Sequence, residues 1–330
     1  MKYKSVVVTE RGGPEVLQVV ENDLREPAAG ELRIKVIATA VGRTDVNYRY
    51  GNSPFSPKVP FVPGYEIMGV VHALGAGVSG FAACDRVAAL TGHGGYSEMI
   101  YLREEHLVHV PESLDSAEVA ILVLNYVAAW QMLHRVAKIK AGDKVLVIGA
   151  SGGVGTAFLQ LGKLAGLRMY GTASPSKHKL LTEYGAVPID YHKQDFVEFL
   201  QHAEPEGLDF VFDGMGGADS DGDLAVLRRG GKLVAYAPAA GFGMLLKGAL
   251  KLVAVNLQSN GKKAESYGIS ALYARDKKPF MEDLPVLFKL LDEGKIKPVI
   301  SQKFAILDAA KANELLESGQ IAGNIVLLAS

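Results

Sequence analysis

Residues 144–155 read KVLVIGASGGVG, and this stretch decides the fold. Its first part, residues 145–148, is a run of β-branched and aliphatic side chains that ends at a glycine, which predicts a strand buried on both faces. Residues 149–155 then form a glycine-rich turn, and residues 156–164 place apolar side chains at helical spacing. A strand, a glycine turn and a helix in this order are the context of a dinucleotide-binding fingerprint.

Two glycines of this turn have separate physical roles. Gly152 allows the backbone to approach a pyrophosphate, and Gly155 allows the helix to pack closely on the strand. The free N–H groups and the positive end of the helix dipole then face the phosphates. Ala150 stands where the usual pattern has its first glycine.

Length and composition predict a folded protein with a sizeable core. A chain of 330 residues with 48% hydrophobic and 22% charged residues corresponds to one large domain or two ordinary ones. The formal net charge is −1 and no basic block stands out, so nothing indicates a nucleic-acid partner.

The number of cysteines and the length of the apolar runs indicate in which cellular compartment the protein is expected. Cys84 is the only cysteine, which excludes an intrachain disulfide and a cysteine-based structural zinc site. The first ten residues have a strand pattern and not that of a signal peptide. The longest uncharged apolar run, residues 119–133, is shorter than the ~20 residues that span a bilayer, so it predicts a buried helix and no membrane span. We therefore expect a cytoplasmic protein.

The sequence pattern changes near residue 115. Before it, short strands alternate with glycine and proline turns, which predicts a partly open barrel with strands at residues 4–9, 17–20, 32–40 and 67–74. After it, a helix at 116–137 precedes alternating strands and helices, which predicts a doubly wound parallel sheet. Residues 266–273 (SYGISALY) are expected to be the edge strand of that sheet.

The residues after the second strand of this sheet indicate the cofactor. A sheet that prefers NAD places an acid about 20 residues beyond the glycine turn, but residues 170–177 contain none. Ser174, Ser176 and Lys177 lie there instead, and hydroxyls with a cation suit a 2′-phosphate. The serines could equally be helix caps and the lysine a solvated side chain. The charge pattern favours NADP(H) over NAD(H).

Several motifs now line up in order along the chain. They are Thr44-Asp45, PGYE at 63–66, GFAACDRV at 80–87, GGYSE at 94–98, NYVAAW at 125–130, the glycine turn, and GTAS at 171–174. Over essentially its full length the chain resembles the medium-chain dehydrogenase/reductase superfamily. Within it, the chain resembles the zinc-free quinone oxidoreductase branch that includes zeta-crystallin, and residues 171–191 are similar to the VAT-1-like subgroup.

The resemblance implies a fold and an assembly. It implies a GroES-like partly open barrel over residues 1–121, a Rossmann domain that binds NADP(H) over 122–274, and a segment 275–330 that returns to the barrel. It places the active site between the two domains. It also implies a homodimer in which the edge strand 266–273 pairs with its symmetry mate, since an unpaired apolar edge is a liability.

The residues argue against zinc. Zinc-dependent members of the superfamily have a cysteine before the Thr-Asp pair and a histidine between the Gly and the Glu of the second motif. This chain has Gly42 and Tyr65 at those positions, and neither is a zinc ligand. We therefore expect no metal.

Hydride transfer is the chemistry that remains, with a quinone or an α,β-unsaturated carbonyl as the acceptor. The product of the hydride step is an oxyanion, which hydrogen-bond donors must face. The candidate donors are Tyr48, Tyr65, Asn125 and Tyr126, although each tyrosine could simply pack its ring and bond its hydroxyl to the backbone.

The resemblance also implies which residues bind the cofactor. Asn125 is expected near the nicotinamide, the pyrophosphate contacts are expected in the glycine turn, and a further group is expected around the 2′-phosphate and along the cleft. The residues concerned are Asn125, Ser151, Gly152, Gly153, Val154, Ser174, Lys177, Tyr191, Tyr236, Ala237, Pro238 and Asn324.

Two features leave a competing function open. Many quinone oxidoreductases have asparagine at the position of Gly42, and Arg43 beside it could face either the cleft or solvent. Residues 241–257 are apolar at helical spacing, with Lys247 and Lys251 on the other face, which suits a covering helix, a lid or a membrane-surface contact. The alternative function is a VAT-1-like protein that binds NADPH and a lipid or partner but turns over little.

Overall fold

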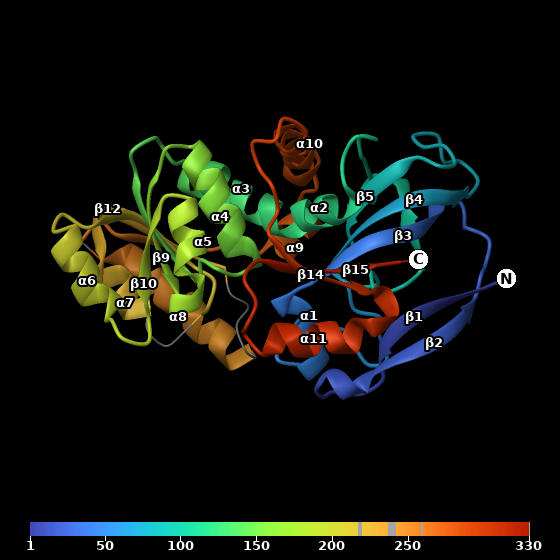
Figure 1. Cartoon of the computed structure of the whole chain (residues 1–330), viewed down its shortest axis with the longest axis horizontal. Helices are drawn as coiled ribbons and strands as arrows, with labels where there is room; N and C mark the ends of the chain where they lie inside the picture. The colour runs from blue at the N-terminus through green and yellow to red at the C-terminus, as the bar shows by residue number, and fades with distance from the viewer. Residues whose placement is uncertain (217–219, 237–241, 259, 330) are drawn as a thin grey trace. The chain divides into compact units, whose positions relative to one another are not determined.

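The computed structural model describes residues 1–216, 220–236, 242–258 and 260–329 (Figure 1). The chain divides into two compact units. Unit 1 contains Met1–Val127 and Asp276–Ser330, and unit 2 contains Ala128–Arg275.

Unit 1 is built on a seven-stranded sheet and a separate two-stranded one. The large sheet has the order β14-β15-β3-β4-β5-β7, and β6 also pairs with β3. The alternating pattern predicted at residues 32–40 is the long central strand, which is buried over most of its length. The strands of unit 1 are β1 (Lys2–Val8), β2 (Leu17–Asp23), β3 (Glu31–Val41), β4 (Glu66–Leu74), β5 (Arg86–Leu90), β6 (Met99–Arg103), β7 (Val108–His109), β14 (Ile300–Ala305) and β15 (Asn324–Leu328).

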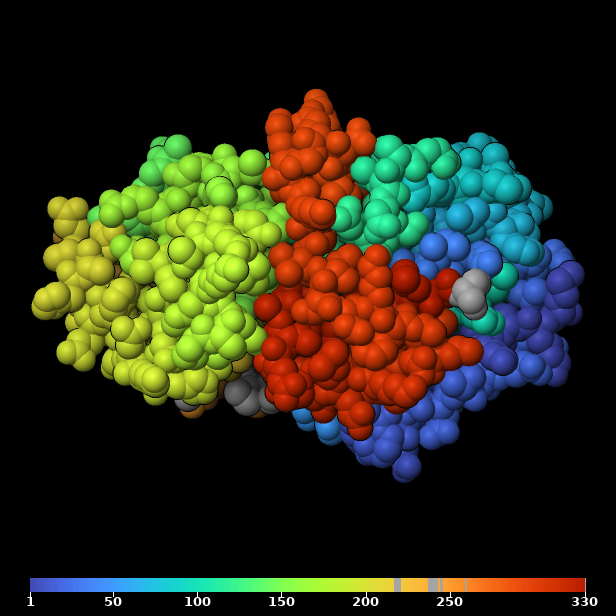
Figure 2. Space-filling model, viewed as in Figure 1, coloured from blue at the N-terminus to red at the C-terminus, as the bar shows by residue number. Residues whose placement is uncertain are grey.

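The C-terminal segment of the chain completes this sheet. β15 lies antiparallel to β3, so that Ile325 pairs with Val41, and parallel to β14 on its other side. In Figure 2 the red C-terminal atoms lie directly against the blue N-terminal ones. The core of unit 1 therefore joins side chains from both ends of the sequence, including Val6, Ile34, Ile67 and Leu327.

The long helix of unit 1 begins at a residue that suits a helix N-terminus. Asp115 caps the long helix by accepting hydrogen bonds from Ala117 N and Glu118 N, both at 3.0 Å. The helical segments that begin in unit 1 are η1 (Pro14–Val16), α1 (Arg43–Tyr50), η2 (Glu104–His106), α2 (Ser116–Ile121), η3 (Leu122–Tyr126), α3 (Val127–Gln131), α10 (Lys278–Asp292), η6 (Ile306–Asp308) and α11 (Ala309–Glu317).

Unit 2 is a doubly wound sheet in which every neighbouring pair is parallel. Its order is β10-β9-β8-β11-β12-β13, so the chain goes outward from β8, returns, and continues outward from β11. Such a reversal is where doubly wound sheets bind their ligands. The strands are β8 (Lys144–Ile148), β9 (Arg168–Ala173), β10 (Ala186–Asp190), β11 (Leu208–Asp213), β12 (Leu227–Ala235) and β13 (Lys263–Ser266).

The helices of unit 2 cover this sheet and complete its core. Leu146, Val211 and Leu233 from three strands meet Leu200 and Val255 from the helices. The helical segments are η4 (Met132–Ala137), α4 (Gly153–Leu164), η5 (Pro175–Lys177), α5 (His178–Glu183), α6 (Phe196–Ala203), α7 (Ser220–Ala225), α8 (Phe242–Leu257) and α9 (Ile269–Arg275).

The predicted edge strand at residues 266–273 is wrong. The edge strand is β13, which ends at Ser266 because its partner β12 ends at Ala235, the residue opposite. Beyond Gly268 the chain forms helix α9, where Ala271 and Leu272 are good helix formers. The apolar residues of this segment therefore belong to a helix and not to a strand.

One helix, Ser116–Ala137, is long and apolar enough to cross a membrane by length and composition alone. Its most apolar window is 72% buried inside the protein, as in the core helix of many folded domains. It coincides with the buried helix that the sequence predicts at residues 116–137.

Candidate active site

The carboxyl end of β8 carries the glycine turn of unit 2. Gly149 adopts a left-handed conformation with φ of +77°, and Gly152 is the N-cap of α4. The first N–H groups of a helix have no partner within the helix, so those of Gly153 and Val154 are available to an anion at this end. Ser151 is buried in the same turn.

Close packing explains both Gly155 and the alanine in the turn. A Cβ on Gly155 would lie 2.4 Å from the carbonyl oxygen of Gly149, so α4 packs directly on the turn. A Cβ on Gly171, in the neighbouring strand β9, would lie 2.7 Å from the Cβ of Ala150. The missing side chain at Gly171 therefore makes room for Ala150, where the usual pattern has glycine.

The ends of β9 and β10 bring three predicted residues to one edge. Asp190 lies opposite Ala173 in the register, so Tyr191 and Ser174 follow directly at the same carboxyl edge. The Ser174 and Ser176 hydroxyl oxygens lie 3.5 Å apart. Burial lowers the pKa of Lys177, and the Tyr191 side chain is exposed.

The end of β12 contributes Tyr236 to this edge. Its backbone N–H donates to Asp213 O at 2.8 Å, and its ring packs over Gly214, where a Cβ would lie 2.4 Å from the ring. Burial raises the pKa of the Tyr236 hydroxyl. The other two residues predicted at this strand end, Ala237 and Pro238, lie outside the described residues.

The sequence analysis missed two residues at the reversal point of this sheet. The Asp213 carboxylate accepts hydrogen bonds from Met215 N at 2.8 Å and Gly216 N at 3.2 Å, which shapes the loop after β11. The Met215 sulfur lies 3.2 Å from the position of a Cβ on Gly149, directly beside the glycine turn. The sequence signal that could have identified Asp213 is an aspartate at the end of a predicted buried strand.

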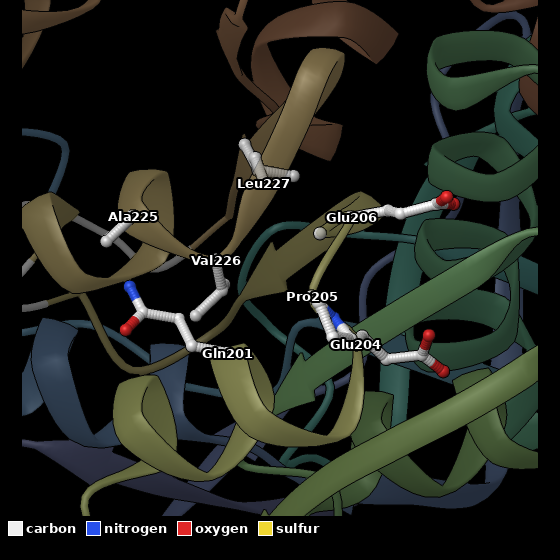
Figure 3. A pocket seen from close by; sticks show the side chains of 8 residues that line it. Gln201, Glu204, Pro205, Glu206, Ala225, Val226 and Leu227 are labelled. Carbon is white, nitrogen blue, oxygen red and sulfur yellow. The ribbon is translucent and has the colours of Figure 1, made fainter.

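A cavity of about 360 Å³ lies at the other edge of the same sheet (Figure 3). Its lining includes Gly207 and Val226, which immediately precede β11 and β12. Glu204 also lines it, and its carboxylate is paired with Lys144 at 2.6 Å. Doubly wound sheets bind their ligands at the carboxyl ends of their strands, so this cavity is not the candidate nucleotide site.

Unit 1 holds two of the predicted donor residues, Tyr48 and Tyr65, near a buried carboxyl group. Asp45 accepts one hydrogen bond from Gly42 N at the start of α1 and another from Gly64 N, both at 2.9 Å. It therefore ties α1 to the segment that leads into β4. Burial raises the pKa of Asp45 to about 6, although these hydrogen bonds oppose the shift.

Tyr48 and Tyr65 lie together on the two segments that Asp45 joins. Their ring centroids are 6.0 Å apart. The two hydroxyls also act on each other's pKa, since Tyr65 lowers that of Tyr48 and Tyr48 raises that of Tyr65. Burial is the largest influence on both and raises both pKa values. Tyr65 is buried, whereas Tyr48 is only partly buried.

Glu66 is a second buried carboxyl group beside this pair. Glu66 is buried, and its Oε2 atom has no hydrogen-bond partner among the described residues. Burial, together with the charge of Asp45, raises the pKa of Glu66 well above its ordinary value. Both influences favour the neutral form of the carboxyl group.

Asn125 and Asn324 are 199 residues apart in sequence and meet in unit 1. Asn125 Nδ2 donates to Asn324 Oδ1 at 2.7 Å, and Asn324 Nδ2 donates to Val299 O at 3.0 Å. Asn125 lies on η3, a π-helical segment of the kind that often occurs at functional sites. Tyr126, the next residue, is fully buried, so we do not retain it as a donor to a substrate.

Known proteins match this chain over almost its whole length. Residues 28–112 match the alcohol dehydrogenase GroES-like domain, and residues 184–327 match the family described as zinc-binding dehydrogenase. The quinone oxidoreductase of Rattus norvegicus is 30% identical over 98% of this chain and 97% of its own length. The chain belongs to the medium-chain dehydrogenase/reductase superfamily. Its relatives place it in the branch of the quinone oxidoreductases and the VAT-1 homologues.

Solved structures of this superfamily share the fold. The human synaptic vesicle membrane protein VAT-1 homolog-like protein has a TM-score of 0.85 and 27% identity, and the match covers 100% of this chain and 99% of that one. A mycobacterial protein in complex with NADPH has a TM-score of 0.86 and 29% identity, over 98% and 99% of the two chains. These matches confirm the predicted GroES-like domain and Rossmann sheet.

The superfamily's metal position holds no metal-binding set in this chain. Gly42 and Tyr65 occupy it, and within the described residues no group of three or more His, Cys, Asp or Glu side chains could hold a metal ion. Arg43, the first residue of α1, is exposed.

Proposed function

We propose that this chain is a zinc-independent oxidoreductase that transfers hydride from NADPH to a quinone or an α,β-unsaturated carbonyl. The observation that carries the proposal is the pair formed by Tyr48 and Tyr65, whose ring centroids lie 6.0 Å apart, with Tyr65 at the position of a metal ligand in zinc-dependent members. The similarity to a quinone oxidoreductase supports the choice of acceptor.

The charge at the edge of unit 2 supports NADP(H) as the cofactor. Ser174, Lys177 and Tyr191 gather where β9 and β10 end, and residues 170–177 contain no acid to repel a 2′-phosphate. The mycobacterial relative in complex with NADPH supports the same choice. NADPH, when bound, supplies the hydride, and the turn from Ser151 to Val154 would hold its pyrophosphate.

Tyr48 would be the donor to the acceptor oxygen. It is only partly buried, whereas Tyr65 is buried with its ring beside that of Tyr48, so the Tyr48 hydroxyl is the one of the pair that a substrate oxygen could reach. Their raised pKa values keep both hydroxyls protonated, so they stabilise the oxyanion as hydrogen-bond donors. Tyr65 is then a positioning residue for Tyr48.

The test is to follow oxidation of NADPH and of NADH by the purified protein with 9,10-phenanthrenequinone and with a 2-alkenal. Turnover of either acceptor that strongly prefers NADPH supports the proposal and assigns the acceptor class. Tight NADPH binding without turnover of either acceptor contradicts it and supports the second candidate below.

The second candidate is a VAT-1-like NADPH-binding protein that binds a lipid or a partner and turns over little. The observation that favours it is an apolar stripe on α8. Leu246, Leu250, Val253 and Leu257 follow at spacings of four, three and four, so they share one helix face, and they are 53%, 63%, 57% and 81% exposed. A helix that only covered the sheet would carry polar side chains on its exposed face.

We also propose a cytoplasmic homodimer. The edge strand β13 has one neighbour, β12, within the described part of the chain, and an unpaired edge favours pairing with a second copy. The mass from light scattering at micromolar concentration tests this, since a monomer would contradict it.

A further inference from the structure

His93 lies at the tip of a loop that is clamped beside Tyr65. The backbone N–H groups of the residues before and after it donate to carbonyl oxygens of residues 62–65. These bonds are Thr91 N and Gly92 N to Tyr65 O at 2.9 and 3.0 Å, Gly94 N to Val62 O at 2.8 Å, and Gly95 N to Gly64 O at 3.0 Å. The Thr91 hydroxyl adds a bond to Gly64 O at 2.8 Å. The loop therefore holds the His93 backbone in a fixed place next to the backbone of Tyr65, one of the two tyrosines.

The two neighbours of His93 are glycines for a conformational reason. Gly92 and Gly94 have φ of +73° and +106°, a region that other residues rarely adopt. The tight loop needs both of them, and neither adds a side chain. His93 is thus the single side chain that this tip presents.

The imidazole of His93 is exposed and has no hydrogen bond or ion pair within the described residues. The titratable groups on the elements packed against its loop are Asp45, Tyr48, Tyr65, Glu66 and Tyr96. Partial burial lowers the pKa of His93, and none of these five groups contributes to the shift. The exposed His93 can therefore exchange its proton with solvent.

The proposed reaction needs a proton that the tyrosines do not readily release. Hydride transfer leaves a negative oxygen on either acceptor, and that oxygen must gain H⁺. The raised pKa values of Tyr48 and Tyr65 make both hydroxyls weak acids. Efficient general acids have pKa values near the working pH. Asp45 also has such a pKa, about 6, but it is buried and its two oxygens accept from Gly42 N and Gly64 N, which leaves the exposed His93 as the suitable side chain.

We propose that His93 is the catalytic proton donor to the acceptor oxygen, an inference that rests on the function proposed above. NADPH is oxidised to NADP⁺ as its hydride, with two electrons, forms a C–H bond on the acceptor. The electrons of the acceptor's conjugated π system move to oxygen. The imidazolium N–H bond of His93 then breaks, an O–H bond forms, and the neutral imidazole regains H⁺ from solvent.

The test is the pH dependence of kcat for the full-length wild-type protein and for H93Q, with NADPH and phenanthrenequinone at saturation. Wild-type kcat is expected to fall as the pH rises through the titration of His93, whose pKa lies below the ordinary 6.5, because only the imidazolium donates. H93Q is expected to lose this descending limb and, on its acid side, at least ~10²-fold in kcat, with KM for NADPH unchanged.

The matched control is H72Q, which replaces another histidine of unit 1. His72 accepts a hydrogen bond from Arg33 Nε at 3.1 Å and lies outside the loop, so the wild-type profile is expected to persist. H93N serves as a second replacement, and an unchanged melting temperature shows that either variant folds. If both H93Q and H93N keep the wild-type pH profile of kcat, His93 is not the proton donor, and the proposed function is unaffected. Absence of turnover in the wild-type protein overturns the proposed function and this inference together.

Discussion

The buried carboxyl group of Asp45 makes the stability of unit 1 depend on pH in an unusual direction. Burial raises the pKa of Asp45 in the folded protein from 3.8 to about 6. The folded state therefore binds a proton more tightly than the unfolded state does. The stabilisation is complete below pH 3.8 and is lost as the pH rises through about 6.

The magnitude follows from the two pKa values of Asp45. A difference of about 2 pH units corresponds to about 3 kcal/mol of unfolding free energy, at about 1.36 kcal/mol for each unit. About half of it, roughly 1.4 kcal/mol, is lost between pH 5 and pH 8. The raised pKa of Glu66 acts in the same direction, so the wild-type protein should lose at least this amount over that interval.

Asp45→Asn removes the titration but keeps the size of the side chain. Because an amide has one acceptor oxygen, the variant also loses one of the two bonds from Gly42 N and Gly64 N, which costs about 1–3 kcal/mol at every pH. We expect D45N to be less stable than the wild type at pH 5, and the difference between the two to shrink by about 1.4 kcal/mol at pH 8.

Urea unfolding of both proteins at pH 5 and pH 8, without cofactor, measures these differences. The comparison separates the lost hydrogen bond from the lost titration, because the former is the same at both pH values. A difference between wild type and D45N that is equal at the two pH values would refute the reasoning.

Three other substitutions test the cofactor and donor residues. Lys177→Glu should lower the NADPH-to-NADH ratio of kcat/KM by roughly 10–100-fold, because a carboxylate replaces a cation near the 2′-phosphate; an unchanged ratio contradicts the assignment. Tyr48→Phe should lower kcat by about 10²–10³ with little change in KM for NADPH, since it removes a donor to the oxyanion, and wild-type turnover would exclude that role. Gly155→Ala places a Cβ 2.4 Å from Gly149 O. Thermal unfolding should therefore show a loss of about 1–3 kcal/mol in stability, and calorimetry should show a weaker affinity for NADPH. A wild-type melting temperature would show that the turn can relax.

Local pattern was sufficient for the elements whose cause is local. The run at residues 145–148, the glycine turn and the apolar spacing beyond it appear in the structure as β8 and α4, because strand and helix periodicity arises from neighbouring residues. The missing zinc ligands at Gly42 and Tyr65 were also visible in the sequence, because side-chain chemistry does not depend on the fold.

The edge strand shows where local pattern was insufficient. Residues 266–273 alternate as a strand would, yet a strand extends only as far as its neighbour does, and β12 ends opposite Ser266. The exposed stripe on α8 is similar, since the sequence showed an apolar helix but not which of its faces the sheet would cover.

Tertiary structure alone decided which of the candidate residues meet in unit 1. The sequence by itself identified Asn125 and Asn324 separately, and Tyr48 and Tyr65 as possible donors. Only the fold showed that the two asparagines meet across 199 residues, and that the two tyrosine rings lie 6.0 Å apart. Burial and the distances between remote segments determine pKa values and hydrogen bonds. Burial and these distances exist only in the packed chain and cannot be obtained from the sequence alone.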